Sequence, residues 1–505
     1  MTQIQRDHCQ SIDAFISEVV AQSKGVGRFC GLFATAERSG VRLDVLFATD
    51  SQLRLTSVLS PESEEGFPSL TPYIPSATWY EREIFDLFGL LATGSSGPYP
   101  LVLPLSKNLP RPRPGSGFAK LRDPFEIDLT PLPAHLQGEG VFTIPYGPVR
   151  SGVFESVEYV VETVGEDVSH LRPRVFYKHR GVQVAFEGLD ISDGVLMAER
   201  SEGVASVANG VAYCSALERI AGVEPPSVAA FLRVIHAELE RIANHLDSII
   251  RHCEAAGQAV AYSRFSLHKE RLQRLRGGMC GSRFGRGVVV PGGVSGPPLI
   301  STKELLGKLD EIEKDLRSDL RLLMATPSFL DRLTGTGVLS PALAHRFAAV
   351  GPVGRGSGQG NDVRFTRAYD GYQHLGHQLI ETRLEGDALS RQWVRIDEIY
   401  GSFHLIRQAT DRLDRAGHSS SMWRSSMWRN NLGVVSGEDW GWAEAPQGEL
   451  LYLVKVEDNK LIRVKPRSAS FHNFGLFQAA FPSDILTDFA FIEASFGISI
   501  AGVAG

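Results

Sequence analysis

Cysteine is scarce in this chain of 505 residues, and the few cysteines it has lie far apart. The five are Cys9, Cys30, Cys214, Cys253 and Cys280, and no two of them form a CxxC pair. An odd, scattered set in a long chain indicates reduced thiols in a cytosolic setting. Cys214 falls within a helical pattern, so we expect it to be a small buried core residue.

Long hydrophobic runs and an excess of basic charge are also missing. No apolar run approaches the roughly 20 residues that a helix needs to span a bilayer. The N-terminal residues MTQIQRDHCQSIDAF lack the charged and apolar regions of a signal peptide. We therefore expect no direct transmembrane segment, and any membrane connection to run through partner proteins. The formal net charge of −6 gives no general electrostatic reason to bind nucleic acid.

The chain is long and apolar enough, with 43% hydrophobic residues, to form two or more domains. Near the N-terminus, residues 11–20 are amphipathic, and residues 29–37 and 41–49 predict paired strands joined by a turn at Ser39-Gly40. Residues 77–90, ATWYEREIFDLFGL, predict an amphipathic helix that ends at Gly89, with charge pairs three and four residues apart. A stretch rich in proline and glycine follows and predicts an extended connector that contains the domain boundary.

A long helix over residues 227–251 is the strongest prediction for the remainder of the chain. Apolar residues recur there at helical spacing after Pro225-Pro226, and its other face is polar, so that face is either solvated or turned toward partner subunits. Further helices are predicted over 303–323 and 388–408, and a hairpin is predicted to turn at Asp458-Asn459. Strands are predicted on both sides of Gly165, the second within RPRVFYKHRGVQ, and the apolar C-terminal segment should be buried.

Several segments, in this order, resemble one known architecture. The segment WYEREIFDLFGL resembles the signature of the 30 kDa subunit of respiratory complex I. The remaining segments resemble its 49 kDa subunit and the large subunit of group 4 membrane-bound [NiFe]-hydrogenases: GPVRSGVFE, YKHRG, AYCSALERIAGVEPP, RVIHAELERIANHL, GPVGRGSG, WVRIDEI and AEAPQGELLYLVKV. A fusion of the two is similar to the formate hydrogenlyase and hydrogenase-4 large subunits.

The resemblance implies an α+β fold in three parts. A small α/β domain of the 30 kDa type should span residues 1–103, and a Pro/Gly-rich linker residues 104–140. A large, mostly helical domain with peripheral β-sheet, of the 49 kDa and hydrogenase large-subunit type, should span residues 141–505.

The four thiolates that hold nickel and iron in the hydrogenases are missing. In the family they come from two CxxC pairs, because soft thiolates suit this centre. Here the first pair of positions holds Glu202 and Ala205, and the second holds Ser499 and Gly502. An arginine beside the cyanide ligands is also replaced, by Gln447. We therefore expect no metal and no resident cofactor on this chain.

A quinone, as in complex I, is the other possible occupant of the cavity. There the resemblance implies a histidine in the first strand loop and a tyrosine after the Glu-Arg pair. Phe154 stands at the position of that histidine, Arg150 at an earlier one, and Gly203 at that of the tyrosine. A quinone site would thus lack its usual hydrogen-bonding residues.

The polar residues that remain are candidates for proton transfer. Glu155 aligns with a carboxylate that lies next to the metal site in related hydrogenases, and it is either a proton-exchanging carboxyl or a surface glutamate in a loop. Glu202 either forms a like-charge pair with Glu155 or meets Arg355, which is a structural partner or a catalytic residue. With Ser499 these are the expected catalytic residues; His179 is expected to have a hydrogen-bonded structural role.

The loop GPVGRGSGQG lacks both the GK[ST] ending of a phosphate-binding loop and a strand–GxGxxG–helix context. We therefore expect any NAD used by the complex to bind another subunit.

The resemblance implies a subunit of a membrane-associated oxidoreductase complex, on the cytoplasmic side of the cell membrane, that takes part in electron transfer and proton coupling. Its partners would be a small subunit with an iron–sulfur cluster and antiporter-like membrane subunits. Two alternatives stay open: a true [NiFe]-hydrogenase or NADH-quinone oxidoreductase large subunit, and a non-catalytic scaffold.

Overall fold

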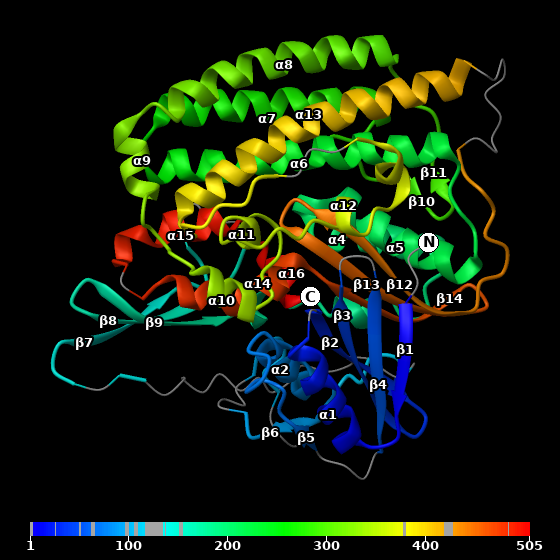
Figure 1. Ribbon diagram of the computed structural model, residues 1–505, viewed down its shortest axis with the longest axis vertical. Helices are drawn as coiled ribbons and strands as arrows, with labels where there is room; N and C mark the ends of the chain where they lie inside the picture. The colour runs from blue at the N-terminus through cyan, green and yellow to red at the C-terminus, as the bar shows by residue number, and fades with distance from the viewer. Residues whose placement is uncertain are drawn as a thin grey trace.

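A layer of long helices lies above several small sheets in the computed structural model (Figure 1). The structure describes residues 4–25, 27–49, 52–61, 66–95, 100–105, 110–116, 135–136, 138–150, 155–376, 380–418, 428–482 and 484–505. Helices and strands are intermixed along the chain, so the fold is α+β, as predicted. Among the described helices, none is both long and apolar enough to cross a membrane.

The N-terminal sheet has the order β1-β4-β3-β2, and α1 packs on it. Its elements are β1 (Ile4–Cys9), α1 (Ile12–Ser23), β2 (Arg28–Glu37), β3 (Gly40–Ala48) and β4 (Leu53–Pro61). Strands β2 and β3 pair antiparallel with Glu37 opposite Gly40, so the predicted hairpin is confirmed. The side chain of Ser11 caps α1 by accepting a hydrogen bond from the Ala14 N–H.

Helix α2 (Ala77–Phe88) also forms as predicted and ends at Gly89, whose φ of 80° favours glycine. Arg82 and Asp86, four residues apart, interact as opposite charges, and the carboxylates of the helix are also buried and reach other segments. Glu81 accepts hydrogen bonds from the loop at Ser69, and Asp86 accepts three from backbone N–H groups of the next loop. Glu83 meets Lys465 of the large domain. The helix thus joins the two parts of the chain.

The helical layer consists of α6 (Ser227–Ala255), α7 (Ala259–Cys280), α8 (Thr302–Leu323) and α13 (Ala388–His418). Their apolar sides share one core, in which Leu239, Ile242, Leu246 and Ile249 of α6 are fully buried. The long helix predicted over residues 227–251 is confirmed by α6. Because α6 packs against α13, α7 and α15, water reaches little of its surface.

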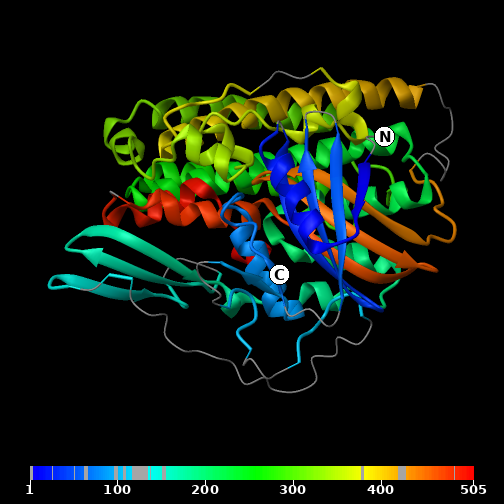
Figure 2. The same ribbon diagram turned by 60° about the horizontal axis from the view of Figure 1, so that its bottom comes forward.

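The hairpin predicted at Asp458-Asn459 joins β13 (Gly448–Glu457) to β14 (Lys460–Arg467), and β12 (Gly437–Ala445) completes that sheet. This sheet packs on α5 and on the N-terminal sheet, which lies in front of it in Figure 2. A second sheet, β7 (Val141–Tyr146), β8 (Glu158–Val164) and β9 (Asp167–Arg174), projects from the molecule (Figure 1). The prediction for its last strand is wrong beyond Arg174, where the chain turns helical.

The C-terminal segment is buried, as predicted, in the core that joins the two parts of the chain. It forms α14 (Ala469–Phe477), α15 (Phe489–Phe496) and α16 (Ile500–Ala504). Trp79 of α2 packs edge-on against Phe474, and Tyr80 against Phe471. Most of the predicted linker, residues 106–109, 117–134 and 137, lies outside the described residues.

The remaining elements are shorter or lie at the edges. They are β5 (Gly66–Pro68), β6 (Leu91–Thr93), α3 (Val182–Ala185), α4 (Ile191–Ser201), α5 (Ser206–Ala221), β10 (Val289–Val290), β11 (Gly293–Val294), α9 (Pro327–Leu333), α10 (Pro341–Arg346), α11 (Gly351–Arg355) and α12 (Val363–Thr366).

Candidate functional site

The break between α4 and α5 meets the start of α16, so two segments from opposite ends of the large domain form one site. Helix α4 stops at Ser201, and Glu202 has an extended backbone before the chain resumes a helical course. A Cβ atom built on Gly502 would lie 2.8 Å from Cδ of Glu202. The carboxyl group of Glu202 therefore occupies the space that a side chain at position 502 would need.

Glu202 is almost fully buried, with 2% of its surface exposed. The Ser470 hydroxyl donates a hydrogen bond of 3.2 Å to its Oε1. Burial, and next the nearby carboxylate of Glu155, raise the pKa of Glu202 to about 8, although the Ser470 hydrogen bond acts in the opposite direction. A carboxyl group with such a pKa is able to exchange a proton near neutral pH.

Glu155 lies at the first turn of α16, where backbone N–H groups lack partners within the helix. Its carboxylate accepts hydrogen bonds from the N–H groups of Ile500 and Ala501 and from the Ser499 hydroxyl, the last two at 3.2 and 3.4 Å. Ser470 links the two glutamates, because its hydroxyl also accepts a 3.1 Å hydrogen bond from the Ser499 N–H. The structure thus brings Glu155, Glu202 and Ser499 together, and Glu155 is not a free surface side chain.

A cavity of about 20 Å³ adjoins these groups, lined by Glu202, Asn209, Lys465, Phe471 and Gly502 among others. A space of this size holds about one water molecule. It is far smaller than the roughly 300 Å³ at which small-molecule pockets begin.

The side chains at the four former thiolate positions do not fit a nickel–iron centre, which prefers soft thiolates. They offer one carboxylate and one hydroxyl, with no ligand atom on Ala205 or Gly502. None of the five cysteines lines the cavity, and Cys214 is fully buried in the core, as expected. Within the described ranges, no three His, Cys, Asp or Glu side chains are grouped to hold a metal ion.

Of the three positions at which the resemblance implies a quinone site, the structure describes Arg150 and Gly203. Arg150 forms a two-point ion pair with Glu493, at 2.8 and 3.1 Å, and stacks over Tyr146 and Tyr159. Gly203 is exposed, and a Cβ atom there would meet nothing within 4 Å. Phe154 lies outside the described residues.

Arg355 does not belong to this site, so the expectation that it meets Glu202 is wrong. Its guanidinium is buried and donates to Oε1 of Glu398, at 2.6 and 2.9 Å, and to Glu444, at 3.1 Å. It also donates to the Asn361 carbonyl. Arg355 is engaged in a separate network beneath the helical layer.

This buried ionic network is built on the polar face of α6, so the alternative of a solvated face is wrong. Arg241 contacts Glu238 and Glu398, and His245 lies 2.8 Å from Glu398. Burial alone would raise the pKa of Glu398, but Arg355 and His245 hold it well below its usual value. Burial, and next Asp362, raise the pKa of Glu444 to about 7. A second titratable group thus lies inside the protein.

Sequence reasoning singled out the α6 residues but not Glu398 or Glu444. A signal was present, because Arg395 and Glu398 lie three residues apart between Val394, Ile396 and Ile399, and a charged residue among apolar neighbours of a helix is buried only when paired. What the sequence does not give is which helix supplies the partner.

Two further motifs have structural roles. His179 Nδ1 lies 2.6 Å from the Ala504 carbonyl oxygen, and the Arg180 N–H donates to the Gly505 oxygen, so this loop holds the C-terminal segment. The glycine-rich loop begins with the short helix α11, and Gly351 is needed because a Cβ atom there would lie 2.0 Å from the Gln447 carbonyl oxygen. Its glycines thus serve close packing against the β12–β13 turn.

Comparison with known proteins identifies the family. Residues 257–504 match the respiratory-chain NADH dehydrogenase 49 Kd subunit family, and residues 5–110 match the 30 Kd subunit family. The chain is 26% identical to formate hydrogenlyase subunit 5 of Escherichia coli over 445 residues, which cover 85% of this chain and 75% of that protein. It is 28% identical to the membrane-bound hydrogenase subunit alpha of Pyrococcus furiosus over 366 residues, 70% of this chain and 84% of that protein.

An NADH-quinone oxidoreductase subunit of Salinispora arenicola is 30% identical over 340 residues, which cover 66% of this chain and 85% of that protein. The resemblance inferred from the motifs is thereby confirmed. The chain belongs to the family of complex I 49 kDa subunits and the related membrane-bound hydrogenase subunits, with a domain of the 30 kDa type fused at its N-terminal side.

Proposed function

We propose that this chain is a subunit of a membrane-associated oxidoreductase complex in which the buried pair Glu202 and Glu155 exchanges protons. The observation that carries the proposal is the placement of Glu202, fully enclosed and next to a second carboxylate, at a position where related hydrogenases hold a metal ligand. Membership of the family supports the assignment to such a complex.

The two carboxyl groups differ in their surroundings, and this suits them to different roles. Glu155 accepts hydrogen bonds from two backbone N–H groups and the Ser499 hydroxyl. Glu202 accepts a hydrogen bond from the Ser470 hydroxyl, and burial raises its pKa, which favours its neutral form. Glu202 is therefore the group that holds the exchangeable proton, and Glu155 stabilises the start of α16.

We further propose that the chain carries no nickel–iron centre and no quinone of its own. The donor atoms present do not fit the metals, and the residues at the quinone positions are paired, exposed or replaced. Electrons would then be handled by a partner subunit with an iron–sulfur cluster, and the chain would lie on the cytoplasmic side of the membrane beside antiporter-like subunits.

Replacement of the glutamates in the assembled complex tests this function. Glu202→Gln keeps the shape of the side chain but removes the exchangeable proton, so we expect a loss of about 10²-fold or more in electron-transfer-linked activity. Glu155→Gln should reduce activity less, because its backbone hydrogen bonds can be kept. Glu254→Gln, at an exposed position of α6, is the control and should leave activity unchanged.

The alternatives give different results in the same experiment. If both Glu202→Gln and Glu155→Gln assemble and keep full activity, the chain is a scaffold and the proton-exchange proposal is wrong. If the purified complex makes or consumes hydrogen and loses that activity in step with its nickel content, the chain is a hydrogenase subunit.

A further inference from the structure

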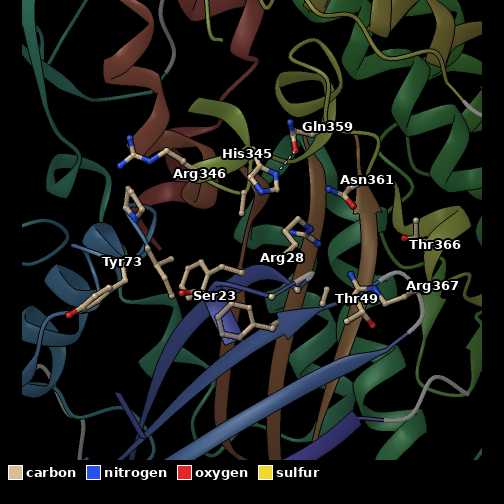
Figure 3. Close-up of a pocket in the computed structure, with 18 residues that line it drawn as sticks. Ser23, Arg28, Thr49, Tyr73, His345, Arg346, Gln359, Asn361, Thr366 and Arg367 are labelled. Atoms are coloured by element: carbon tan, nitrogen blue, oxygen red, sulfur yellow. Dashed lines mark hydrogen bonds between the residues drawn. The ribbon is translucent and has the colours of Figure 1, made fainter. Parts of the chain in front are cut away.

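An opening between the N-terminal domain and the large domain is distinct from the Glu202 site. This cavity of about 390 Å³ is bounded by the end of α1, the start of β2, the end of β3, the turn before α2, helix α10 and the segment around α12 (Figure 3). Its volume is in the range of pockets that bind small molecules. No residue of the Glu202 site lines it.

The lining of this cavity carries positive charge and no negative charge. Arg28, Arg346 and Arg367 contribute guanidinium groups, whereas no Asp or Glu is among the described residues that line it. Arg346 is exposed on α10 and forms no ion pair with any described residue. Figure 3 shows these side chains on different sides of the opening, together with His345, Gln359 and Asn361.

Beneath the cavity, positive charge exceeds negative charge as well. Arg28, Arg367 and Arg467 share one carboxylate, that of Glu449. The Nη1 atoms of Arg28 and Arg367 are buried and have no hydrogen-bond partner among the described residues. Buried donors of this kind normally have a partner, and an unpaired one is costly. Arg367, with 3% of its surface exposed, is thus a buried cation with unused hydrogen-bonding capacity.

The rest of the lining is partly apolar and partly polar. Phe29, Phe47, Tyr73 and Ile74 supply apolar and aromatic surface, and Thr49, Asn361 and Thr366 supply uncharged polar groups. Tyr73 is 57% exposed, so its ring is available to a planar ligand. A lining that combines guanidinium groups with apolar and aromatic surface suits a ligand that has an anionic group and an apolar body.

We propose that this interdomain cavity binds a phosphorylated small molecule with an aromatic body, its phosphate group held by arginine side chains of the lining, Arg346 among them. Guanidinium groups recognise phosphate through charge-assisted hydrogen bonds, which are stronger than neutral ones. The ligand would contact both domains at once and so stabilise their contact. The site is independent of the proton exchange assigned to Glu202.

Calorimetric titration of the full-length protein with three probes tests the site: AMP, inorganic phosphate and adenosine. We expect AMP to bind more tightly than either phosphate or adenosine, and its affinity to fall as salt rises. Arg346→Gln should weaken AMP binding about tenfold or more, as the loss of one charge-assisted hydrogen bond implies. Arg412→Gln, an exposed arginine on α13, is the matched control and should not change the affinity.

Arg346 is exposed and has no ion pair with any residue that the structure describes, so its replacement is not expected to unfold the protein, and thermal unfolding of the variant checks this directly. Bound AMP should also raise the unfolding temperature of the wild type but not that of Arg346→Gln. Absence of AMP binding, equal binding of adenosine, equal binding of phosphate alone, or an unchanged affinity of a folded Arg346→Gln variant would each overturn the proposal.

Discussion

The pH dependence of stability provides a direct test of the environment of Glu202. In the folded protein the pKa of this carboxyl lies at about 8, compared with 4.5 for the same group in water. Below pH 4.5 the group is protonated in both states. Between pH 4.5 and 8 the folded protein keeps a proton that the unfolded chain has lost, so the free energy of unfolding falls as the pH rises. The stability associated with this group is lost by about pH 8.

The size of the effect follows from the same two values. A difference of one pKa unit corresponds to about 1.4 kcal/mol, so the shift of Glu202 corresponds to at most about 5 kcal/mol between pH 4.5 and pH 8 or above. Because Glu202 is 2% exposed, solvent screening reduces this value little. Glu202→Gln cannot ionise, and its stability should lack this decline.

Urea denaturation of the wild type and of Glu202→Gln at pH 5, 7 and 9 measures the difference. Other titrating groups are common to both proteins and cancel. We expect the variant to gain stability relative to the wild type as the pH rises, and Glu254→Gln to change stability by less than about 0.5 kcal/mol, as is usual for exposed positions. A difference between wild type and Glu202→Gln that is the same at all three pH values would refute the reasoning.

Three further predictions concern the same structure. Gly502→Ala should lower the free energy of unfolding by about 1–3 kcal/mol, because the added methyl group meets the Glu202 carboxyl. In a double-mutant cycle with Glu202→Ala, measured by urea denaturation, most of this loss should disappear. If the effects of the two substitutions simply add, the contact is not present. Arg355→Met should lower the free energy of unfolding by about 3–5 kcal/mol, because the buried carboxyl groups of Glu398 and Glu444 lose a positively charged partner. If the loss is equal to that of Arg412→Met, at an exposed arginine, the network is not as described. Arg150→Met should lower the free energy of unfolding by about 2–4 kcal/mol, because it removes the ion pair with Glu493 and the stacking on aromatic rings. A variant whose thermal unfolding matches that of the wild type would exclude this structural role.

Local patterns in the sequence were sufficient to predict most secondary structure. The hairpins at Ser39-Gly40 and Asp458-Asn459 and the helix after Pro225-Pro226 depend on neighbouring residues, and they form where expected. The strand predicted beyond Arg174 was wrong, because the residues that follow turn helical and hold the C-terminal segment instead of pairing with β8.

The candidate site was only partly predictable. The resemblance indicated that Glu202 and Ser499 occupy positions of one metal site, and the structure links them with Glu155 and Ser470 by hydrogen bonds. Arg355 was assigned to the wrong cluster, because a charged residue in a glycine-rich loop does not reveal which of several buried carboxylates it will meet. Ser470 was missed, since a serine at the start of α14 looks like an ordinary helix-capping residue.

Nickel analysis of the purified complex shows whether this chain holds the metal, since none of Glu202, Ala205, Ser499 and Gly502, at the positions of the hydrogenase thiolates, is a cysteine. We expect nickel to be substoichiometric and unrelated to activity, and Glu202→Gln to impair the complex without changing its metal content. Stoichiometric nickel that depends on this chain, together with hydrogen turnover, would contradict this expectation.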